Sequence, residues 1–159
     1  AGDRAIIQIS QILKEVSRQT DIVVRWGGEE FLMVARQETC QDACFLAERI
    51  RFSVLKRLFD LGNDITCSLT CSVGFACYPF ICPDQEDFEI DWEEIVGIAD
   101  QALYAAKNNG RDMWVGIIST EKTKTQELLR RVRKDAAGMQ NNGELEIFHS
   151  KCGLEKLII

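Results

Sequence analysis

The sequence predicts an α+β domain in which helices flank a largely antiparallel sheet. Three observations predict this class. Stretches with apolar residues at helical spacing alternate with strand patterns, a glycine pair joins two short apolar runs, and one stretch alternates apolar and polar residues at period two. A chain of 159 residues that is 46% apolar is long enough to bury a hydrophobic core of its own.

The first third of the chain predicts a helix followed by a hairpin. Residues 4–17 carry apolar side chains at near-helical spacing, which is typical of an amphipathic helix. Two apolar runs, 22–26 and 31–35, then lie on either side of Gly27 and Gly28. We interpret them as two buried strands of a β-hairpin whose turn contains the glycine pair.

The middle of the chain predicts a second helix and a long strand. Apolar residues recur every three or four positions over 43–58, and the residues at 62–63, glycine and asparagine, end that region. From 65 to 77 apolar and polar residues alternate, so we expect a half-buried strand or one arm of a hairpin. Two prolines then bracket an irregular acidic loop over 79–89.

The last third predicts two more helices and one strand. Apolar positions over 92–106 predict a third helix, which the Asn-Gly pair at 109–110 ends. Residues 113–118 predict a last strand. The tail over 123–137 has apolar residues on one side and several basic ones elsewhere, which predicts a short amphipathic helix packed on the domain.

Charge and cysteine usage narrow the possible functions. A net charge of −6 argues against nonspecific binding to a nucleic-acid polymer, which depends on an excess of lysine and arginine. The seven cysteines form no Cys-x-x-Cys pair and His149 is the only histidine, a composition that does not favour zinc. Three cysteines fall at apolar strand positions, Cys67, Cys71 and Cys77. We therefore expect free buried thiols and a reducing, cytoplasmic location.

The glycine turn combines groups that suit phosphate and metal. Without Cβ atoms, Gly27 and Gly28 leave backbone N–H groups open to a ligand oxygen. Because successive strand side chains point to opposite faces, Glu29 and Glu30 are not expected to serve one site together. One is the better metal candidate and the other braces the turn. The alternative is an ordinary hairpin with solvated acids.

The run Gly27-Gly28-Glu29-Glu30-Phe31 resembles the signature of GGDEF-domain diguanylate cyclases in its Glu-for-Asp form. Further matches follow in the family's order, namely Arg18-x-x-Asp21, Ala47 to Arg51, Ser72-Val73-Gly74 and Ala99 to Arg111. The resemblance extends from Ala1 to about Gly116. It implies a partial GGDEF domain over 1–118 and a C-terminal extension over 119–159.

The resemblance implies a palm-like, ferredoxin-related sheet and a catalytic function. The family condenses two GTP molecules into cyclic di-GMP with loss of pyrophosphate. Glu29 matches its metal ligand and suspected base, with Mg²⁺ as the expected ion and Mn²⁺ as an alternative, and Glu30 matches a supporting catalytic residue. Gly27 and Gly28 match the turn against which substrate binds. A symmetric product from two identical substrates implies a homodimer in the active state.

Three further residues match substrate-binding positions of the family. Lys107 and Arg111 match cations that grip the triphosphate, although cations are common at helix C-termini because of the helix dipole. Asp3 matches an acid that binds guanine, although it could simply cap the first helix.

Arg18 and Asp21 match the family's inhibitory product site. An arginine fork suits guanine O6 and N7 or a phosphate, and a carboxylate accepts from the guanine N1 and N2 hydrogens. Arg49 matches an arginine that completes such a site from a neighbouring domain. The alternatives are a local Arg18–Asp21 ion pair and, for Arg49, one of many surface arginines.

The family's opening strand, with Asp-x-Asp, and opening helix have no counterpart after Ala1. We therefore expect a parent diguanylate cyclase, with any membrane attachment through upstream sensor domains, and little or no turnover by this chain. Glu29 alone is a poor Mg²⁺ site. A competing interpretation is a cyclic di-GMP receptor module without turnover. A third is a structural dimerisation domain that binds no nucleotide.

Overall fold

A computed structural model describes residues 2–37, 39–80 and 90–151 of the chain. It divides into two compact units, Ala1–Cys71 and Ser72–Ile159, which are described separately below. The α+β class predicted from the sequence is confirmed, since helices alternate with strands that pair mostly antiparallel. Most of the predicted 79–89 loop lies outside the described residues. Within them, no helix combines the length and apolar character that crossing a bilayer requires.

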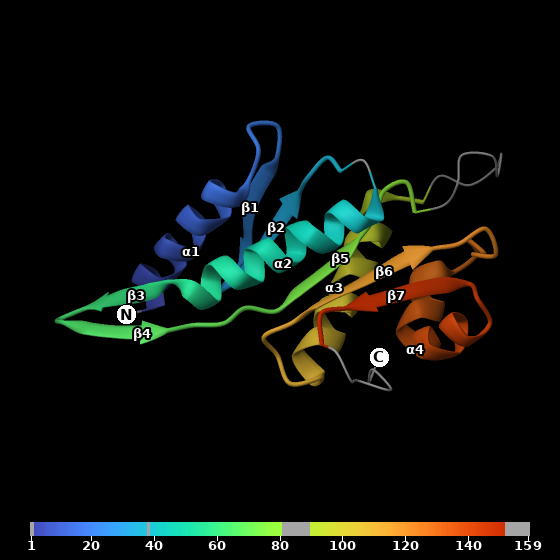
Figure 1. Cartoon of the computed structure of the whole chain (residues 1–159). Helices are drawn as coiled ribbons and strands as arrows, with labels where there is room; N and C mark the ends of the chain where they lie inside the picture. The colour runs from blue at the N-terminus through green and yellow to red at the C-terminus, as the bar shows by residue number, and fades with distance from the viewer. Residues whose placement is uncertain (1, 38, 81–89, 152–159) are drawn as a thin grey trace. The chain divides into compact units, whose positions relative to one another are not determined.

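The first unit contains two helices and two β-hairpins (Figure 1). The elements are α1 (Gly2–Val16), β1 (Ile22–Gly27), β2 (Glu30–Val34), α2 (Cys40–Lys56), β3 (Leu58–Gly62) and β4 (Ile65–Ser68). Its core consists of Ile12 from α1, Val54 from α2 and Phe59 from β3, with partly buried side chains packed around them. The helix and hairpin predicted over residues 4–35 are therefore confirmed as elements.

Helix α2 begins earlier and ends earlier than the sequence predicted. Thr39 and Asp42 form a capping box, in which Thr39 Oγ1 accepts the Asp42 N–H at 3.2 Å and Asp42 Oδ2 accepts the Thr39 N–H at 3.0 Å. After Lys56 the backbone becomes extended, and Leu58 starts a strand. The prediction of a helix to Leu58 was wrong because that residue pairs with Ser68 across a hairpin.

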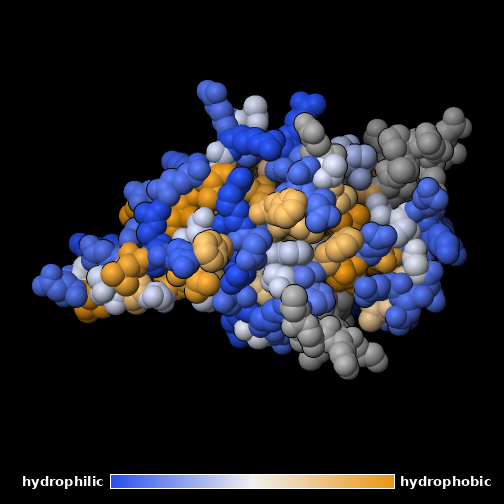
Figure 2. Space-filling model, viewed as in Figure 1, coloured by the Kyte–Doolittle hydropathy of each residue, from blue (hydrophilic) through white to orange (hydrophobic). Residues whose placement is uncertain are grey.

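The strands of the β1–β2 hairpin are less buried than the sequence predicted. Alternate side chains stay in solvent: Ile22 is 58% exposed, Trp26 55% and Val34 58%. The two strands pair only with each other among the described residues, and the alternate β1 side chains of Ile22, Val24 and Trp26 are all exposed. Hydrophobic residues also reach the surface around β3 and β4 (Figure 2), where Leu58 and Ile65 are exposed.

The alternating stretch from 65 to 77 forms two strands rather than one. Residues 65–68 are β4, which pairs with β3, and β5 (Val73–Ala76) belongs to the sheet of the second unit. The period-two pattern continues through both strands, so it carries no sign of the break between them. The stretch is divided because its two halves pair with different strands.

The second unit contains a three-stranded sheet and two helices (Figure 1). Its elements are β5, α3 (Trp92–Asn108), β6 (Trp114–Ser119), α4 (Leu128–Asn141) and β7 (Leu145–His149). Strand β6 is central, parallel to β5 and antiparallel to β7. The segment predicted as the last strand is therefore the middle of the sheet, and the sequence prediction missed β7.

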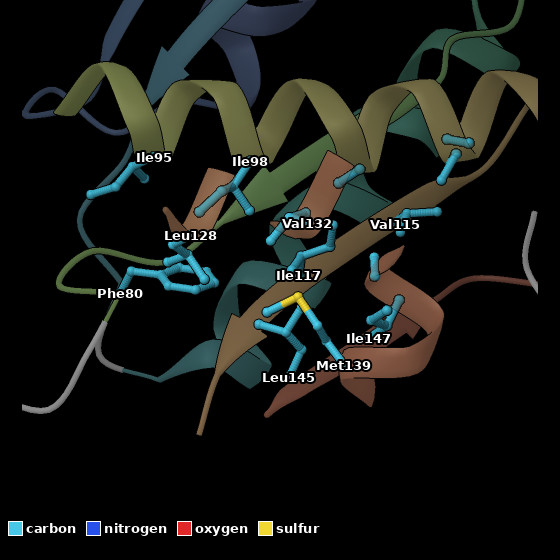
Figure 3. Close-up of a cluster of buried hydrophobic side chains, with 14 of the residues drawn as sticks. Phe80, Ile95, Ile98, Val115, Ile117, Leu128, Val132, Met139, Leu145 and Ile147 are labelled. Carbon is cyan, nitrogen blue, oxygen red and sulfur yellow. The ribbon is translucent and has the colours of Figure 1, made fainter. Parts of the chain in front are cut away.

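One hydrophobic cluster holds the second unit together (Figure 3). It joins Ile98 of α3, Ile117 of β6, Val132 of α4 and Leu145 of β7. The predicted tail helix is thus confirmed as a helix packed on the domain, although it spans 128–141 rather than 123–137. Its regular path is broken at Asp135, whose carboxylate accepts the Gly138 N–H at 2.8 Å.

The five described cysteines form no disulfide with one another and are half-buried rather than fully buried. Cys82 and Cys152 lie outside the described residues. Burial raises the pKa of the Cys44 thiol, and neighbouring Cys40 raises this pKa further. At neutral pH Cys44 therefore stays a protonated thiol, which is the less nucleophilic form.

Helix α3 contacts strand β5 through Gly74. A Cβ atom at this position would lie 2.1 Å from the Leu103 backbone nitrogen and 2.3 Å from the Ala99 backbone oxygen. No real side chain fits at such distances, and a helix backbone cannot rotate away as a side chain can. The close packing of α3 on β5 therefore requires glycine at position 74.

We expect Gly74→Ala to lower the free energy of unfolding by about 3 kcal/mol or more, because it forces α3 away from β5. Urea denaturation measures the loss. Gly97→Ala is the matched control, since the atoms nearest to its Cβ would belong to the Leu129 side chain, at 2.6 Å, and not to a backbone. There we expect a change within about 1 kcal/mol. Equal losses for the two variants would contradict the packing argument.

Candidate functional site

The hairpin turn between β1 and β2 is open on its outer side and held by one arginine. Gly28 has a φ of +53°, and a Cβ at Gly27 or Gly28 would meet no atom within 4 Å. Arg25 donates from Nε and Nη2 to the Gly28 carbonyl oxygen, at 3.0 and 2.8 Å. A forked donor on a single acceptor orients the turn without covering it. The space beside the glycines is therefore accessible to a ligand.

The two adjacent glutamates lie at the end of this turn, and both are exposed. Glu29 belongs to the turn itself, whereas Glu30 is the first residue of β2 and pairs with Gly27. Because Glu29 is not in a strand, strand alternation does not decide where its side chain points relative to that of Glu30. The predicted metal ligand thus projects into solvent from the tip of the hairpin.

The residues around Glu29 supply an incomplete set of metal ligands. Within the ranges that the structure describes, no three or more histidine, cysteine or acidic side chains gather where they could hold an ion. Mg²⁺ usually takes one or two carboxylates together with substrate phosphates. Glu29 can provide one carboxylate, so the described residues do not form a metal centre by themselves.

Arg18 and Asp21 close the turn that leads from α1 into β1. Asp21 Oδ2 accepts the Arg18 backbone N–H at 2.7 Å, and the Arg18 carbonyl accepts the Asp21 N–H at 3.0 Å. The Arg18 guanidinium makes a long, 3.4 Å contact with the Arg36 carbonyl instead. Among the described residues, then, the two side chains form no ion pair, unlike the local pair that we considered from the sequence.

The other oxygen of the Asp21 carboxylate is unsatisfied. Asp21 Oδ1 is buried and has no hydrogen-bond partner within the part of the chain that the structure describes. A buried acceptor without a donor costs about 1–3 kcal/mol. Such an atom beside an exposed arginine is a feature that a ligand with N–H donors and acceptor oxygens would satisfy.

The structure brings Arg49 to the same turn. Its Nη2 donates at 2.8 Å to the carbonyl of Val16, the last residue of α1 and two positions before Arg18. This bond satisfies an end carbonyl of α1, which is a structural role for Arg49. It also places the guanidinium of an exposed residue next to the Arg18–Asp21 turn within a single unit.

Asp3 lies apart from this group. It occupies the first turn of α1, where an acidic side chain is favourable because of the helix dipole. The 15-residue helix separates Asp3 from the Arg18 turn by about 20 Å. The structure therefore supports the helix-stabilising interpretation of Asp3 and does not bring it to Arg18 and Asp21.

The remaining two predicted residues, Lys107 and Arg111, stand at the C-terminal end of α3 in the second unit. Asn109 caps the helix, and Gly110 follows with a φ of +95°. Arg111 and Asp112 continue the left-handed turn with φ values of +55° and +48°, and the Arg111 N–H bonds to the Ala106 carbonyl at 3.1 Å. The turn places an exposed arginine one helical turn beyond a half-buried lysine.

Sequence reasoning missed two residues that shape these turns. Arg25 could have been found, since it stands three positions before Gly28 in the strand that leads into the turn. Lys151, which donates to the Asn109 carbonyl at 3.0 Å, has no local signal because 42 residues separate the two groups. A shallow hollow elsewhere, lined by Gln140 and Phe148 among others, contains none of the predicted residues.

Sequence comparison relates the chain to enzymes of one kind. The profile described as "Diguanylate cyclase, GGDEF domain" matches residues 1–113. Diguanylate cyclase A of Treponema denticola is 37% identical over 114 residues, which are 70% of this chain and 28% of that protein. Diguanylate cyclase DosC of Escherichia coli is 33% identical over 111 residues, 70% of this chain and 22% of that protein. The chain thus matches about a quarter of the length of these relatives.

Two solved structures show the same fold. The GGDEF domain of TpbB (YfiN) from Pseudomonas aeruginosa superposes with a TM-score of 0.59 at 30% identity, covering 70% of this chain and 61% of that one. The GGDEF domain of DgcB from Caulobacter crescentus, in complex with c-di-GMP, gives a TM-score of 0.58 at 27% identity, covering 69% and 61%.

The Arg25 clamp on the glycine turn can be tested by amide hydrogen exchange. In Arg25→Met we expect the amides from Gly28 to Glu30 to exchange about tenfold faster, because the turn loses both bonds to the Gly28 carbonyl. Global stability should fall by less than about 1 kcal/mol, since the arginine is exposed. Arg36→Met is the control for loss of an exposed arginine and should leave these amides unchanged. Unchanged exchange in Arg25→Met would contradict the clamp.

Proposed function

The chain belongs to the GGDEF family of diguanylate cyclase domains, and from this we propose that it is the nucleotide-binding part of an enzyme that makes cyclic di-GMP. In this reaction each ribose 3′ oxygen attacks the α-phosphorus of the other GTP, and each attack releases one pyrophosphate. The observation that carries the proposal is the hairpin turn. Its open glycines and exposed Glu29 belong to the run that resembles the family's signature.

The turn residues of the first unit are assigned to phosphate and metal. Gly27 and Gly28 leave room for a phosphate to approach the backbone N–H groups. Glu29 is the proposed ligand of a divalent cation, Mg²⁺ or alternatively Mn²⁺, which would screen phosphate charge. Glu30, held in the first pair of β2, is proposed to support the turn. The family is generally metal-dependent, and a cation held by Glu29 would need further ligands from phosphates or other groups.

The basic residues at the end of α3 in the second unit are assigned to the triphosphate. Lys107 and Arg111 lie one helical turn apart, and the left-handed turn at Gly110 exposes the arginine. Two cations at this spacing suit a polyphosphate, which offers several anionic oxygens. Asp3 is a weaker candidate for binding guanine, because its position in the first turn of α1 already explains an acidic residue there.

We extend the proposal to assembly and location. Two identical substrates and a symmetric product need two facing half-sites, so the active state is proposed to be a homodimer. GTP as substrate favours the cytoplasm, and so do five described cysteines that form no disulfide with one another.

The Arg18 turn is proposed to bind the product. Its support is the combination of an exposed guanidinium, the unsatisfied Asp21 Oδ1 and the nearby Arg49 guanidinium in one unit. Guanine offers N1 and N2 hydrogens to a carboxylate and O6 and N7 to an arginine. The same observation favours a second candidate function, a cyclic di-GMP receptor module without turnover.

Turnover separates these two functions from one another. Because no three or more metal-ligating side chains gather among the described residues, we expect the purified 159-residue chain with Mg²⁺ and GTP to form little or no cyclic di-GMP. Chromatography of the nucleotides measures this, with an active cyclase as the positive control. Steady conversion of GTP by the chain, lost in Glu29→Gln, would overturn the expected inactivity and exclude the receptor function.

Product binding is tested by calorimetry with cyclic di-GMP. We expect Arg18→Ala to weaken binding at least tenfold, because a charged hydrogen bond contributes about 1.5–3 kcal/mol. Asp21→Asn should also weaken it, since one carboxylate acceptor becomes a donor. Arg4→Ala removes an exposed arginine from the far end of α1 in the same unit, so it is the matched control and should bind as the unaltered chain does. Equal binding by Arg18→Ala, or no binding by the unaltered chain, would rule the product site out.

A further inference from the structure

Lys151 contacts the turn that carries the proposed phosphate-binding arginine. It lies just after β7, outside the 1–113 segment that matches the family. Its Nζ donates to the Asn109 carbonyl at 3.0 Å and would lie 3.0 Å from a Cβ built on Gly110. The ammonium group therefore rests directly on the backbone that leads from α3 to Arg111.

The backbone before Lys151 is fixed by the sheet. Strand β7 pairs with β6 up to the match of His149 with Val115. The next residue, Ser150, bonds twice to Trp114: its Oγ accepts the Trp114 N–H at 3.1 Å, and its N–H donates to the Trp114 carbonyl at 3.2 Å. Lys151 follows immediately and is half-buried. It is thus anchored more firmly than a typical surface lysine.

The turn that Lys151 contacts has an uncommon backbone conformation. Gly110, Arg111 and Asp112 all have positive φ values, of +95°, +55° and +48°. Two of them are not glycine, and this conformation is uncommon for residues with side chains and is favoured where surrounding contacts hold it. A charge-assisted bond to the last carbonyls of a helix is such a contact, and a cation there is also favoured by the helix dipole.

We propose that Lys151 is a positioning residue for triphosphate binding, acting through the turn that presents Arg111. The inference rests on the proposed function, since it assigns the α3 end to a nucleoside triphosphate. By holding the Asn109 carbonyl, Lys151 keeps the left-handed turn in place and thereby fixes the direction of the Arg111 side chain. It supplies this role from a segment beyond the family match.

Calorimetry with GTP and with GMP, both in Mg²⁺, tests the role in the full 159-residue chain. We expect Lys151→Met to weaken GTP binding about fivefold, because a charged hydrogen bond to the turn is lost. GMP, which lacks the β- and γ-phosphates, should bind within about twofold of the unaltered chain. Lys151→Arg should restore GTP binding to within about twofold, since a guanidinium can also donate to the carbonyl.

Control variants separate the possible failures. Lys122→Met removes an equal charge from an exposed lysine of the same unit and should not change GTP binding. Thermal unfolding checks that each variant is folded. If Lys151→Met is not folded, GTP binding by Lys151→Arg is compared with that of the unaltered chain. If Lys107→Ala abolishes GTP binding while Lys151→Met has no effect on it, the role of Lys151 is overturned and the proposed function is not. Equal weakening of GTP and GMP also overturns it. No GTP binding by the unaltered chain overturns the proposed function, and this inference with it.

Discussion

Helix α3 can lie against strand β5 only because residue 74 has no side chain, and the second unit is organised around that contact. The helix backbone at Ala99 and Leu103 occupies the space that a Cβ would need. With the helix this close, its buried face meets the sheet and α4 in one cluster. The same contact positions α3 against the sheet, and α3 carries Lys107 and the turn to Arg111 at its C-terminal end. A backbone packing constraint thus places the proposed phosphate-binding cations.

In the first unit, the proposed site residues are positioned differently, by a few polar contacts at turns of the chain. Arg25 holds the Gly28 carbonyl, and Asp21 holds the Arg18 N–H. Arg18 and Glu29 are exposed at these two turns, and the neighbouring strand residues Ile22 and Trp26 are exposed as well. These turns can therefore remain open to a nucleotide while their backbones stay ordered. The unsatisfied Asp21 Oδ1 is consistent with a site that is completed by a ligand.

Local patterns predicted some elements well and others badly, for physical reasons. The spacing of apolar residues in α1 and α3 and the glycine pair of the first hairpin are short-range signals, and those elements formed where expected. Leu58 also fits a helical spacing, but it pairs with Ser68 and therefore belongs to β3. The break at 69–72 and strand β7 depend on pairing with distant segments. Local periodicity contains no information about such partners.

The sequence by itself determined the family, the order of the main elements and the identity of the residues proposed to bind nucleotide, because these depend on residue type and spacing along the chain. Only the tertiary structure decided what each of those residues contacts. It separated the Arg18 side chain from Asp21, brought Arg49 to their turn, and placed Lys151 on the turn before Arg111. The contacts made by the Arg18, Arg49 and Lys151 side chains join residues that are 18 to 42 positions apart in the sequence. The local ion pair expected between Arg18 and Asp21 does not form. These contacts follow from packing and strand register, which no local pattern specifies.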